Sequence, residues 1–308
     1  MILIRSLNQI SKTINECCLT VGNFDGLHQG HLEIINKVKD IAQEKKLSSA
    51  LLTFQPHPLS FIKKNYQQDF IITNLATKID IIKKLGIDYL IILKFDKNFA
   101  DISAKDFIDE ILIKKLNTKH LVIGYNFNFG KNREGNIETL KKTTINLNQV
   151  DPVMVKLDNQ EITSSSTNIR NLIKEGNFDF VNKILTKNFT ISGTVNYGQK
   201  LATKIGFPTL NIMPKPFMIK PKFGVYKTKT FIPSLKKVFP SITNFGIKPT
   251  INYGGQPIYE THIPNFSENI YEQKIYIEFI NFIREEKIFS NVEDLKKQIS
   301  KDIFECNL

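Results

Sequence analysis

Tryptophan is missing from this 308-residue chain, and cysteine and histidine are scarce, with 3 and 5 residues respectively. The cysteines are Cys17, Cys18 and Cys306, which form no Cys-x-x-Cys pair and no spaced cluster with histidine. This shortage excludes a disulfide framework and a structural zinc site as the basis of the fold. The length and the 41% hydrophobic content suit two globular domains, each with its own core.

Long apolar runs are absent as well. The segment YLIIL at 89–93 is far shorter than the ~20 residues that a membrane span needs. The N-terminal segment is broken by Arg5 and by polar residues before the apolar core of a signal peptide could form. We therefore expect a cytoplasmic protein that has no membrane partner.

Acidic residues are outnumbered by basic ones, 30 to 42, which gives a net charge of +12. The excess is spread over both halves of the chain without a basic tail or stripe, so we expect no nucleic-acid partner. A generally basic surface also suits anionic nucleotides. A regulator that binds flavin or RNA without catalysis remains an alternative, and a steep salt dependence of RNA binding would be its signature.

The first 186 residues alternate apolar strand patterns with helical patterns. The strands are expected at 17–24, 50–54, 89–95, 120–124 and 150–157, and the helices at about 31–45, 76–85 and 103–116. This order predicts an α/β fold with a parallel, doubly wound sheet. In such a sheet ligands bind at the carboxyl ends of the strands.

The segment LTVGNFDGLHQGH at 19–31 is the centre of this half. Gly22 and Gly26 allow a tight turn and a close approach of the backbone to a ligand. The helical spacing that follows places His28 and His31 in the first turn of a helix, on one face. A helix N-terminus presents free N–H groups and favours anions, so this pair is well placed to meet phosphate oxygens.

Three more motifs follow predicted strands or precede a helix. TFQPHP at 53–58 holds His57 between two prolines, either lining a site or exposed on a stiff turn. GYNFNFG at 124–130 offers aromatic rings to a purine or flavin, or to the core. SSSTNIR at 164–170 offers hydroxyls and an arginine, which can cap a helix or bind phosphates.

From residue 187 the pattern changes to short β-rich runs between Gly, Pro and Asn residues. Regular turn signals of this kind indicate a small antiparallel barrel or sandwich. Ser290 and Glu293 have the spacing of a capping box that opens a helix to about 304. We therefore expect two domains, 1–186 and 187–308.

The motifs of the first half resemble those of the nucleotidyltransferases, which share an HxGH signature, here His28-Gln29-Gly30-His31. The segment GNFDGLHQGH at 22–31 is more similar to the FMN adenylyltransferase half of the bacterial bifunctional riboflavin kinase/FAD synthetase family. This resemblance implies a Rossmann-like nucleotidyltransferase domain with His28 and His31 as catalytic residues. It implies an ATP and phosphate site formed by Gly22, Asn23, Phe24, Asn126, Ser165, Ser166 and Arg170. Asn126 stands where the family also has Asp.

The second half resembles the riboflavin kinase domain of the same family. GQKLATKIGFPTLN at 198–211 is similar to its GxxLGRxxGFPTxN pattern, and NFGIKPT at 244–250 and ETHI at 260–263 match later motifs. The resemblance implies a β-barrel with Glu260 as general base, and with Thr209 and Asn211 as ligands of Mg²⁺. The implied ATP and flavin site comprises Gly198, Lys204, Gly206, Phe207, Pro208, Thr209 and Asn211.

Together these resemblances imply a bifunctional enzyme that converts riboflavin and ATP to FMN, and then FMN and ATP to FAD and pyrophosphate. The expected cofactor is Mg²⁺, and the expected partners are small molecules. One departure matters, because Ala202-Thr203 replaces the family's Gly-Arg and Lys204 is the nearest substitute for the lost cation. The alternative is therefore an adenylyltransferase alone, with a weakened or lost kinase half or with another phosphate acceptor. The sequence does not determine the oligomeric state.

Overall fold

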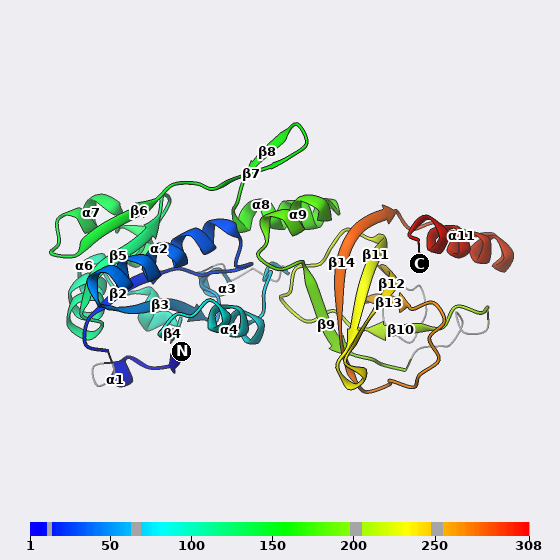
Figure 1. Cartoon of the computed structure of the whole chain (residues 1–308), viewed down its shortest axis with the longest axis horizontal. Helices are drawn as coiled ribbons and strands as arrows, with labels where there is room; N and C mark the ends of the chain where they lie inside the picture. The colour runs from blue at the N-terminus through cyan, green and yellow to red at the C-terminus, as the bar shows by residue number, and fades with distance from the viewer. Residues whose placement is uncertain (11–13, 63–68, 198–204, 248–254, 308) are drawn as a thin grey trace. The chain divides into compact units, whose positions relative to one another are not determined.

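The computed structural model describes residues 1–10, 14–62, 69–197, 205–247 and 255–307 (Figure 1). It divides into two compact units, Met1–Ser166 and Thr167–Leu308. Each unit has its own sheet and its own hydrophobic core.

The first unit is built on a six-stranded parallel sheet (Figure 1). The strands run in the order β1-β4-β3-β2-β5-β6, and every neighbouring pair is parallel. Their bounds are β1 Ile2–Ile4, β2 Cys17–Val21, β3 Ser48–Gln55, β4 Tyr89–Lys94, β5 Thr118–Gly124 and β6 Asn146–Val150. The helical segments are α1 Leu7–Ile10, α2 Gln29–Lys45, α3 Pro58–Ile62, α4 Leu75–Lys84, α5 Lys97–Ala100, α6 Ala104–Asp106, η1 Phe107–Lys115, η2 Lys131–Arg133 and α7 Ile137–Lys141.

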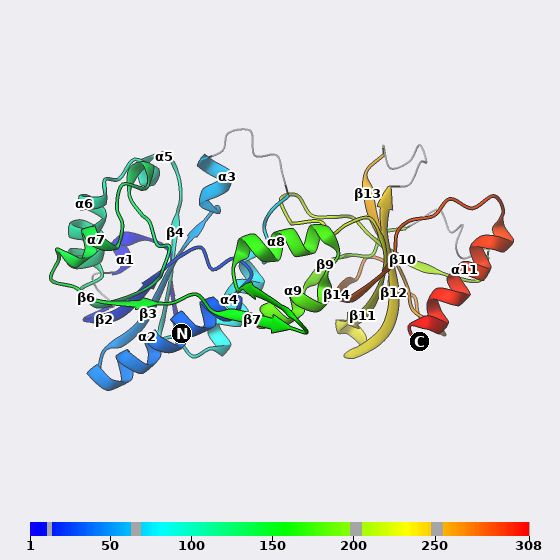
Figure 2. The same cartoon turned by 90° about the horizontal axis from the view of Figure 1, so that it is seen from above.

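The two faces of this sheet pack against different helices, which confirms the doubly wound prediction (Figure 2). Leu19 and Val21 of β2 belong to a core that contains the apolar side chains of η1. Cys18, which directly precedes Leu19, faces the opposite core together with Ile35 and Val38 of α2. Successive residues of a strand point to opposite faces, so a strand buried on both faces is apolar throughout, as β2 is.

The strand order reverses at β2. The chain passes from β2 to β3 and β4 on one side, and then crosses to β5 on the other side. The carboxyl ends of β2 at Val21 and of β5 at Gly124 are therefore neighbours at the switch point of the sheet. The glycine-rich segment that follows β2 starts at this point.

Two predicted strands have different bounds in the structure. The strand expected over 17–24 ends at Val21, because Phe24 adopts a left-handed φ of 47° that no strand accommodates. The single strand expected over 150–157 is wrong: β6 ends at Val150, and β7 Met154–Leu157 forms a separate hairpin with β8 Gln160–Thr163. Asp151 and Pro152 lie between the two strands, and proline lacks the N–H that a ladder needs.

The second unit begins with α8 Ser166–Glu175, which starts in the first unit, and α9 Phe178–Ile184. Its sheet is antiparallel, in the order β10-β13-β12-β11-β14-β9. The bounds are β9 Thr190–Thr194, β10 Thr209–Ile212, β11 Gly224–Ile232, β12 Lys237–Ile247, β13 Pro257–His262 and β14 Lys274–Arg284, with η3 at Pro233–Leu235. The first and last strands are joined by one bridge, at Asn196 and Asn211, so the sheet curls into a partly closed barrel.

The barrel interior mixes apolar and hydroxyl side chains. Tyr226 and Phe279 are fully buried there and meet with ring centroids 5.0 Å apart. Thr228 lies between Ser241 and Thr243 on β12, with oxygen distances of 2.8 and 2.9 Å. Buried hydroxyls need partners, and these supply one another across the strands.

Helix α11, Val292–Glu305, packs on the outer face of this sheet (Figure 1). Cys306 at its end joins a small core with Val225 and Ile242, whose side chains face outward. The helix was predicted, but its predicted cap was wrong. Asn291, and not Ser290, is the N-cap, and its side chain accepts the N–H of Asp294.

Candidate active sites

The segment after β2 brings His28 and His31 together at the N-terminus of α2, as predicted. His28 is the N-cap residue, 6% exposed, and its Nδ1 lies 3.4 Å from the backbone nitrogen of His31. The two rings stack with centroids 3.6 Å apart. His28 therefore caps the helix and also forms, with His31, a pair of imidazoles at the positive end of the α2 dipole.

Serine 164 fixes this arrangement from a distant part of the chain. Its hydroxyl lies 3.1 Å from His28 Nδ1 and accepts the N–H of Gly30 at 3.1 Å. A Cβ at Gly30 would come within 3.1 Å of the Ser164 carbonyl oxygen, so glycine permits the close packing. Ser164 belongs to the predicted hydroxyl motif, but no sequence pattern indicates that Ser164, and not Ser165 or Ser166, pairs with His28.

The other predicted residues of this segment lie around the same turn. Gly22 donates its N–H to the Leu52 carbonyl at 3.0 Å, which ties the end of β2 to β3. Phe24 is buried, and its ring lies against His31 with centroids 5.0 Å apart. Asn23 is half-buried. The buried side chain of Phe24 therefore packs against the turn that carries His31.

The hydroxyl motif crosses the boundary between the two units. The Ser166 hydroxyl donates to the Asp25 carbonyl at 2.7 Å, which attaches the start of α8 to the segment after β2. Ser165 precedes α8 directly, and the half-buried Arg170 lies on that helix in the second unit.

Asn126 follows β5 and is exposed, and its Oδ1 lies close to Gly124, the last residue of that strand.

An arc of phenylalanines lies along the carboxyl ends of β3, β4 and β5. Phe54 and Phe99 meet at 5.2 Å, and Phe127 stacks on Phe129 at 5.5 Å. Phe129 is 8% exposed and belongs to the core, as one reading of its motif expected, whereas Phe127 is half-buried. The arc comprises Phe54, Phe61, Phe95, Phe99, Phe107, Phe127 and Phe129.

His57 is not a solvated turn residue. It is 7% exposed, its Nδ1 accepts the N–H of Leu59 at 3.2 Å, and its ring meets Phe70 edge-on at 5.1 Å. It therefore packs at the start of α3, at the same edge of the sheet.

In the second unit, three predicted residues meet on the outer face of the barrel. Asn211 on β10 lies directly opposite Glu260 on β13, and Thr209 lies opposite His262 on the same pair of strands. Directly opposed residues have Cβ atoms about 4.5 to 5.5 Å apart. Thr209, Asn211 and Glu260 therefore share one face of the sheet.

Asn211 Oδ1 is a polar atom of this face that a ligand could satisfy. It is buried and has no hydrogen-bond partner among the residues that the structure describes. A buried oxygen of this kind is costly unless a cation or donor meets it. The three residues before β10 lie beside His262 of β13 or lead up to it. Gly206 has a left-handed φ of 92°. The ring of Phe207 meets the ring of His262 edge-on, and the Pro208 carbonyl lies 2.9 Å from His262 Nδ1. Gly198 and Lys204, together with Ala202-Thr203, lie outside the described residues.

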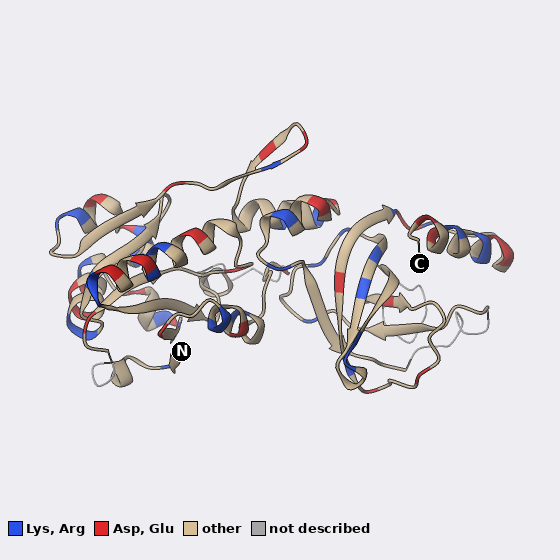
Figure 3. Ribbon diagram, viewed as in Figure 1, with Lys and Arg blue, Asp and Glu red and all other residues tan. Residues whose placement is uncertain are grey.

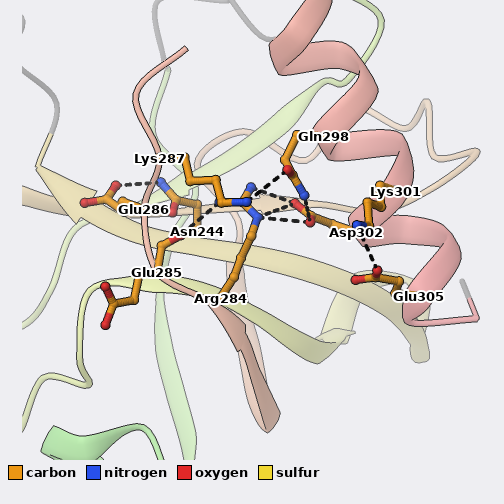
Figure 4. Close-up of polar contacts among 9 residues, drawn as sticks. All are labelled: Asn244, Arg284, Glu285, Glu286, Lys287, Gln298, Lys301, Asp302 and Glu305. Carbon is orange, nitrogen blue, oxygen red and sulfur yellow. Dashed lines mark hydrogen bonds and ion pairs between the residues drawn. The ribbon is translucent and has the colours of Figure 1, made fainter.

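A polar cluster that sequence reasoning missed adjoins this face (Figure 4). Asn244 on β12 lies opposite Glu260 and donates its Nδ2–H to Glu286 Oε1 at 3.3 Å. Beside it, Arg284 donates from Nη2 to Asp302 Oδ2 at 2.7 Å, and Gln298 donates to Asp302 Oδ1 at 2.8 Å. No local sequence pattern indicates these pairs, because their members lie on different elements: the strands β12 and β14, the connection after β14, and helix α11.

Charges elsewhere are mixed in sign. Lys and Arg alternate with Asp and Glu along α2, α4 and α11 (Figure 3). No group of three or more His, Cys, Asp or Glu residues able to hold a metal occurs within the described parts of the chain. In the same parts, no helix is both long and apolar enough to cross a membrane.

Comparison with known proteins identifies the family of each half of the chain. The family model of FAD synthetase matches residues 10–168, and that of riboflavin kinase matches residues 185–307. The bifunctional riboflavin kinase/FMN adenylyltransferase of Buchnera aphidicola from Schizaphis graminum is 37% identical over 98% of this chain and 97% of its own. Its counterpart in Escherichia coli K12 is 31% identical over 98% of this chain and 96% of its own.

One solved structure is similar over the whole length. It is described as a macrolide-efflux protein from Streptococcus pneumoniae, and it matches with a TM-score of 0.83 and 26% identity over 98% of this chain and 97% of that one. The likeness supports the two-unit fold. Both family models and the full-length relatives agree: the chain belongs to the bifunctional riboflavin kinase/FMN adenylyltransferase family, with an N-terminal FAD synthetase domain and a C-terminal riboflavin kinase domain.

Proposed function

We propose that the stacked pair His28 and His31 is the catalytic centre of the adenylyltransferase. The observation that carries this proposal is their place, at the N-terminus of α2 and at the switch point of the parallel sheet. Both the helix end and the switch point favour a bound nucleotide phosphate. Gly22, Asn23, Phe24 and Asn126 border this point, and Ser165, Ser166 and Arg170 would supply hydroxyls and a cation to the phosphates.

In this reaction a phosphate oxygen of FMN attacks the α-phosphorus of ATP. One P–O bond forms, the bond to the β-phosphate oxygen breaks, and pyrophosphate leaves with the electron pair. The FMN phosphate is already ionised, so no strong base is needed. His28, His31 and the positive end of the α2 dipole act by orienting the triphosphate and by stabilising the charge that develops.

The phenylalanine arc offers a place for the isoalloxazine ring of FMN. Its half-buried and exposed members, Phe61 and Phe127 among them, present apolar surface at the strand ends where ligands of this fold bind. Flat conjugated rings pack well against aromatic side chains. We therefore assign the flavin to this edge of the first unit.

For the kinase, Glu260 is proposed to take the proton of the riboflavin 5′-hydroxyl as its oxygen attacks the γ-phosphorus of ATP, so that ADP leaves. Thr209 and Asn211 would hold Mg²⁺, a hard cation that prefers such oxygens and that, when bound, spreads the phosphate charge. The buried Asn211 oxygen supports this assignment. Gly206, Phe207 and Pro208 would border ATP, together with Gly198 and Lys204, which the structure does not describe.

The substrates are therefore ATP, riboflavin and FMN, and the cofactor is Mg²⁺. We propose a cytoplasmic enzyme whose partners are these small molecules and not nucleic acid. The interspersed charges of both signs support the latter point. We also propose the division of the two catalytic domains at 186/187, which keeps the motif at 165–170 with the adenylyltransferase.

Replacement of His28 or His31 by alanine tests the first site. FAD formation from supplied FMN should fall by roughly 10²-fold or more, as it does when one preorganised charge-stabilising donor is lost. FMN formation from riboflavin should be unchanged, and it reports in the same tube that the chain is folded. A parallel loss of both activities in a chain with a native circular dichroism spectrum would contradict the assignment of two separate sites.

The alternative, a weakened kinase half, rests on Ala202-Thr203. Arginine offers phosphate a forked cation, which threonine lacks. The double change Ala202→Gly with Thr203→Arg should then raise kinase efficiency at subsaturating MgATP by about tenfold, the value of roughly one phosphate contact. No gain would show that Lys204 or another group already supplies that contact.

A further inference from the structure

Lysine 78 is a buried cation that the proposed mechanism does not use. It lies on α4 and is 5% exposed, which is rare for lysine unless its ammonium has partners. Its Nζ donates to the Asn23 carbonyl oxygen at 2.6 Å. The hydroxyl of Thr53, at the end of β3, donates to the same oxygen at 3.2 Å. Two donors from different elements thus converge on one peptide of the segment after β2.

This peptide lies where the backbone is strained. Phe24 and Leu27 have φ values of 47° and 45°, a left-handed conformation that costs non-glycine residues about 1 kcal/mol or more. Surrounding contacts must therefore impose this conformation. The charge-assisted bond from Lys78 acts one residue before Phe24, at the start of the strained stretch.

Asp25 fixes the same segment from the other side. Its carboxylate, 1% exposed, accepts the N–H groups of Ile72 at 3.0 Å and of Thr73 at 3.0 Å, just before α4. Burial lowers the pKa of the Lys78 ammonium, and the Asp25 carboxylate opposes that change. The segment and the start of α4 are thereby joined at two points by two buried charges of opposite sign.

The joined segment leads directly to the phosphate end of the site. The Asp25 carbonyl accepts the hydroxyl of Ser166, and three residues later His28 begins α2. We infer that Lys78 is a positioning residue of the adenylyltransferase, which holds the backbone from Asn23 to His28 in the conformation that binds the ATP triphosphate. This inference rests on the proposed assignment of the adenylyltransferase site to this segment.

The variant Lys78→Met keeps the length and the apolar stem of the side chain but removes the ammonium. Assayed on the full chain, its kcat/KM for MgATP in FMN adenylylation should fall about 10- to 100-fold, as expected when a reacting group is held less accurately. The KM for MgATP should rise, because the misplaced segment binds the triphosphate less well in every molecule. A role in folding alone would lower the active fraction and leave this KM unchanged.

Two matched variants sharpen the test. Lys83→Met makes the same chemical change at an exposed position of α4 and should leave the KM and kcat/KM as they are. Thr53→Val removes the second donor to the Asn23 carbonyl and should raise the KM less than Lys78→Met does. Because both donors act on one oxygen, the double variant should lose less than the product of the two single effects.

The riboflavin kinase activity of the same chain serves as the internal measure of folding and should be unchanged in every variant. A wild-type KM for MgATP in Lys78→Met would overturn the inference while His28→Ala still lost FAD formation. Retained FAD formation in His28→Ala would overturn the proposed site itself. Strictly multiplicative losses in the Lys78→Met/Thr53→Val double variant would also overturn the inference, since the two donors would then act separately.

Discussion

At the scale of single residues, the carboxylate that we propose as the kinase base has polar neighbours on both sides. Glu260 lies between Asn211 and Asn244 on the flanking strands. We predict that Glu260→Gln, which keeps the shape but cannot accept a proton as a base, lowers riboflavin phosphorylation by about 10²- to 10⁴-fold. Supplied FMN should still be converted to FAD. The rates of the two reactions, measured on one preparation, check this, and unchanged phosphorylation would exclude Glu260 as the base.

A glycine in the loop after β5 gives a prediction about stability. Gly130 has φ 74° and ψ 172°, and an added Cβ would lie 2.7 Å from the backbone nitrogen of Ala104. We expect Gly130→Ala to lower the free energy of unfolding by roughly 2 to 4 kcal/mol, through strain and overpacking together.

Gly255 provides the matched comparison, because its φ of 72° is similar while no atom of the residues that the structure describes lies within 4 Å of its Cβ position. Gly255→Ala should cost only about 1 kcal/mol, the cost of the backbone conformation alone. Urea denaturation of both variants separates the two contributions. Equal losses would show that contact with Ala104 is not the reason for a glycine at 130.

How far the sequence predicts individual residues depends on how local their partners are. His28 and His31 were predictable because they are three residues apart and a helix places them on one face. Lys78 was not, because its partner Asn23 is 55 residues away and only the fold brings the two together. Ser164 and His28 are 136 residues apart. Long-range polar pairs leave no periodic signal in a sequence.

At the scale of elements, helix α11 is held to the barrel by one buried ion pair more than by apolar contact. Arg284 and Asp302 have side chains only 15% and 2% exposed, and they are joined by a bidentate set of hydrogen bonds (Figure 4). The apolar contact beside them is small, with Cys306 and Ile303 of the helix against Val225 and Ile242.

We therefore predict that Asp302→Asn loosens α11 selectively. Loss of one partner leaves the other charge buried and uncompensated, which costs about 3 to 5 kcal/mol. Cys306, the residue after α11, should become reactive to a thiol reagent at a denaturant concentration that leaves Cys17 and Cys18 protected. Burial raises the pKa of both Cys17 and Cys18 to about 12, so they stay protonated and unreactive while the first unit is folded.

The neighbouring change Lys301→Gln is the control. Its ion pair with Glu305 is 3.6 Å long and exposed, so its loss should alter the free energy of unfolding by less than about 1 kcal/mol. Labelling of all three thiols at the same denaturant concentration in Asp302→Asn would show that the ion pair supports the whole chain rather than α11.

Element boundaries show where sequence patterns stop being informative. The helix at the C-terminus was predictable from its amphipathic spacing, but two polar residues, Ser290 and Asn291, could each cap it. The choice depends on which residue has extended backbone geometry, and that is set by the connection from β14. Likewise, the apolar run over 150–157 has the composition of one strand, but Pro152 lies within it and separates β6 from β7.

At the scale of the whole molecule, the alternation of strands and helices predicted the doubly wound sheet, because a parallel sheet needs a crossover between strands. The strand patterns of the second half do not distinguish a barrel from a sandwich, because side chains alternate between inward and outward positions in both folds. Only the pairing of β9 with β14 and the bridge from Asn196 to Asn211 decide for the curled sheet. The segment 167–186 lies in the second unit, which no pattern predicts: α9 packs on β14, where Phe178 meets Phe279 at 5.1 Å.

Two cores and two sites in one chain lead to a prediction about the whole reaction. His28→Ala should block FAD formation and Glu260→Gln should block FMN formation, so neither variant alone should convert riboflavin to FAD. Mixed in equal amounts, they should do so, because FMN released by the intact kinase of one chain can reach the intact adenylyltransferase of another through solution. FAD should then appear after a lag during which FMN accumulates, and the lag should shorten as the protein concentration rises, since transfer between chains is bimolecular. Separation of riboflavin, FMN and FAD over time checks this, with the wild-type chain at the same concentration as the reference. If the mixture forms no FAD, while each variant retains its remaining activity on supplied substrate, the FMN that the kinase makes must stay bound to the chain that formed it.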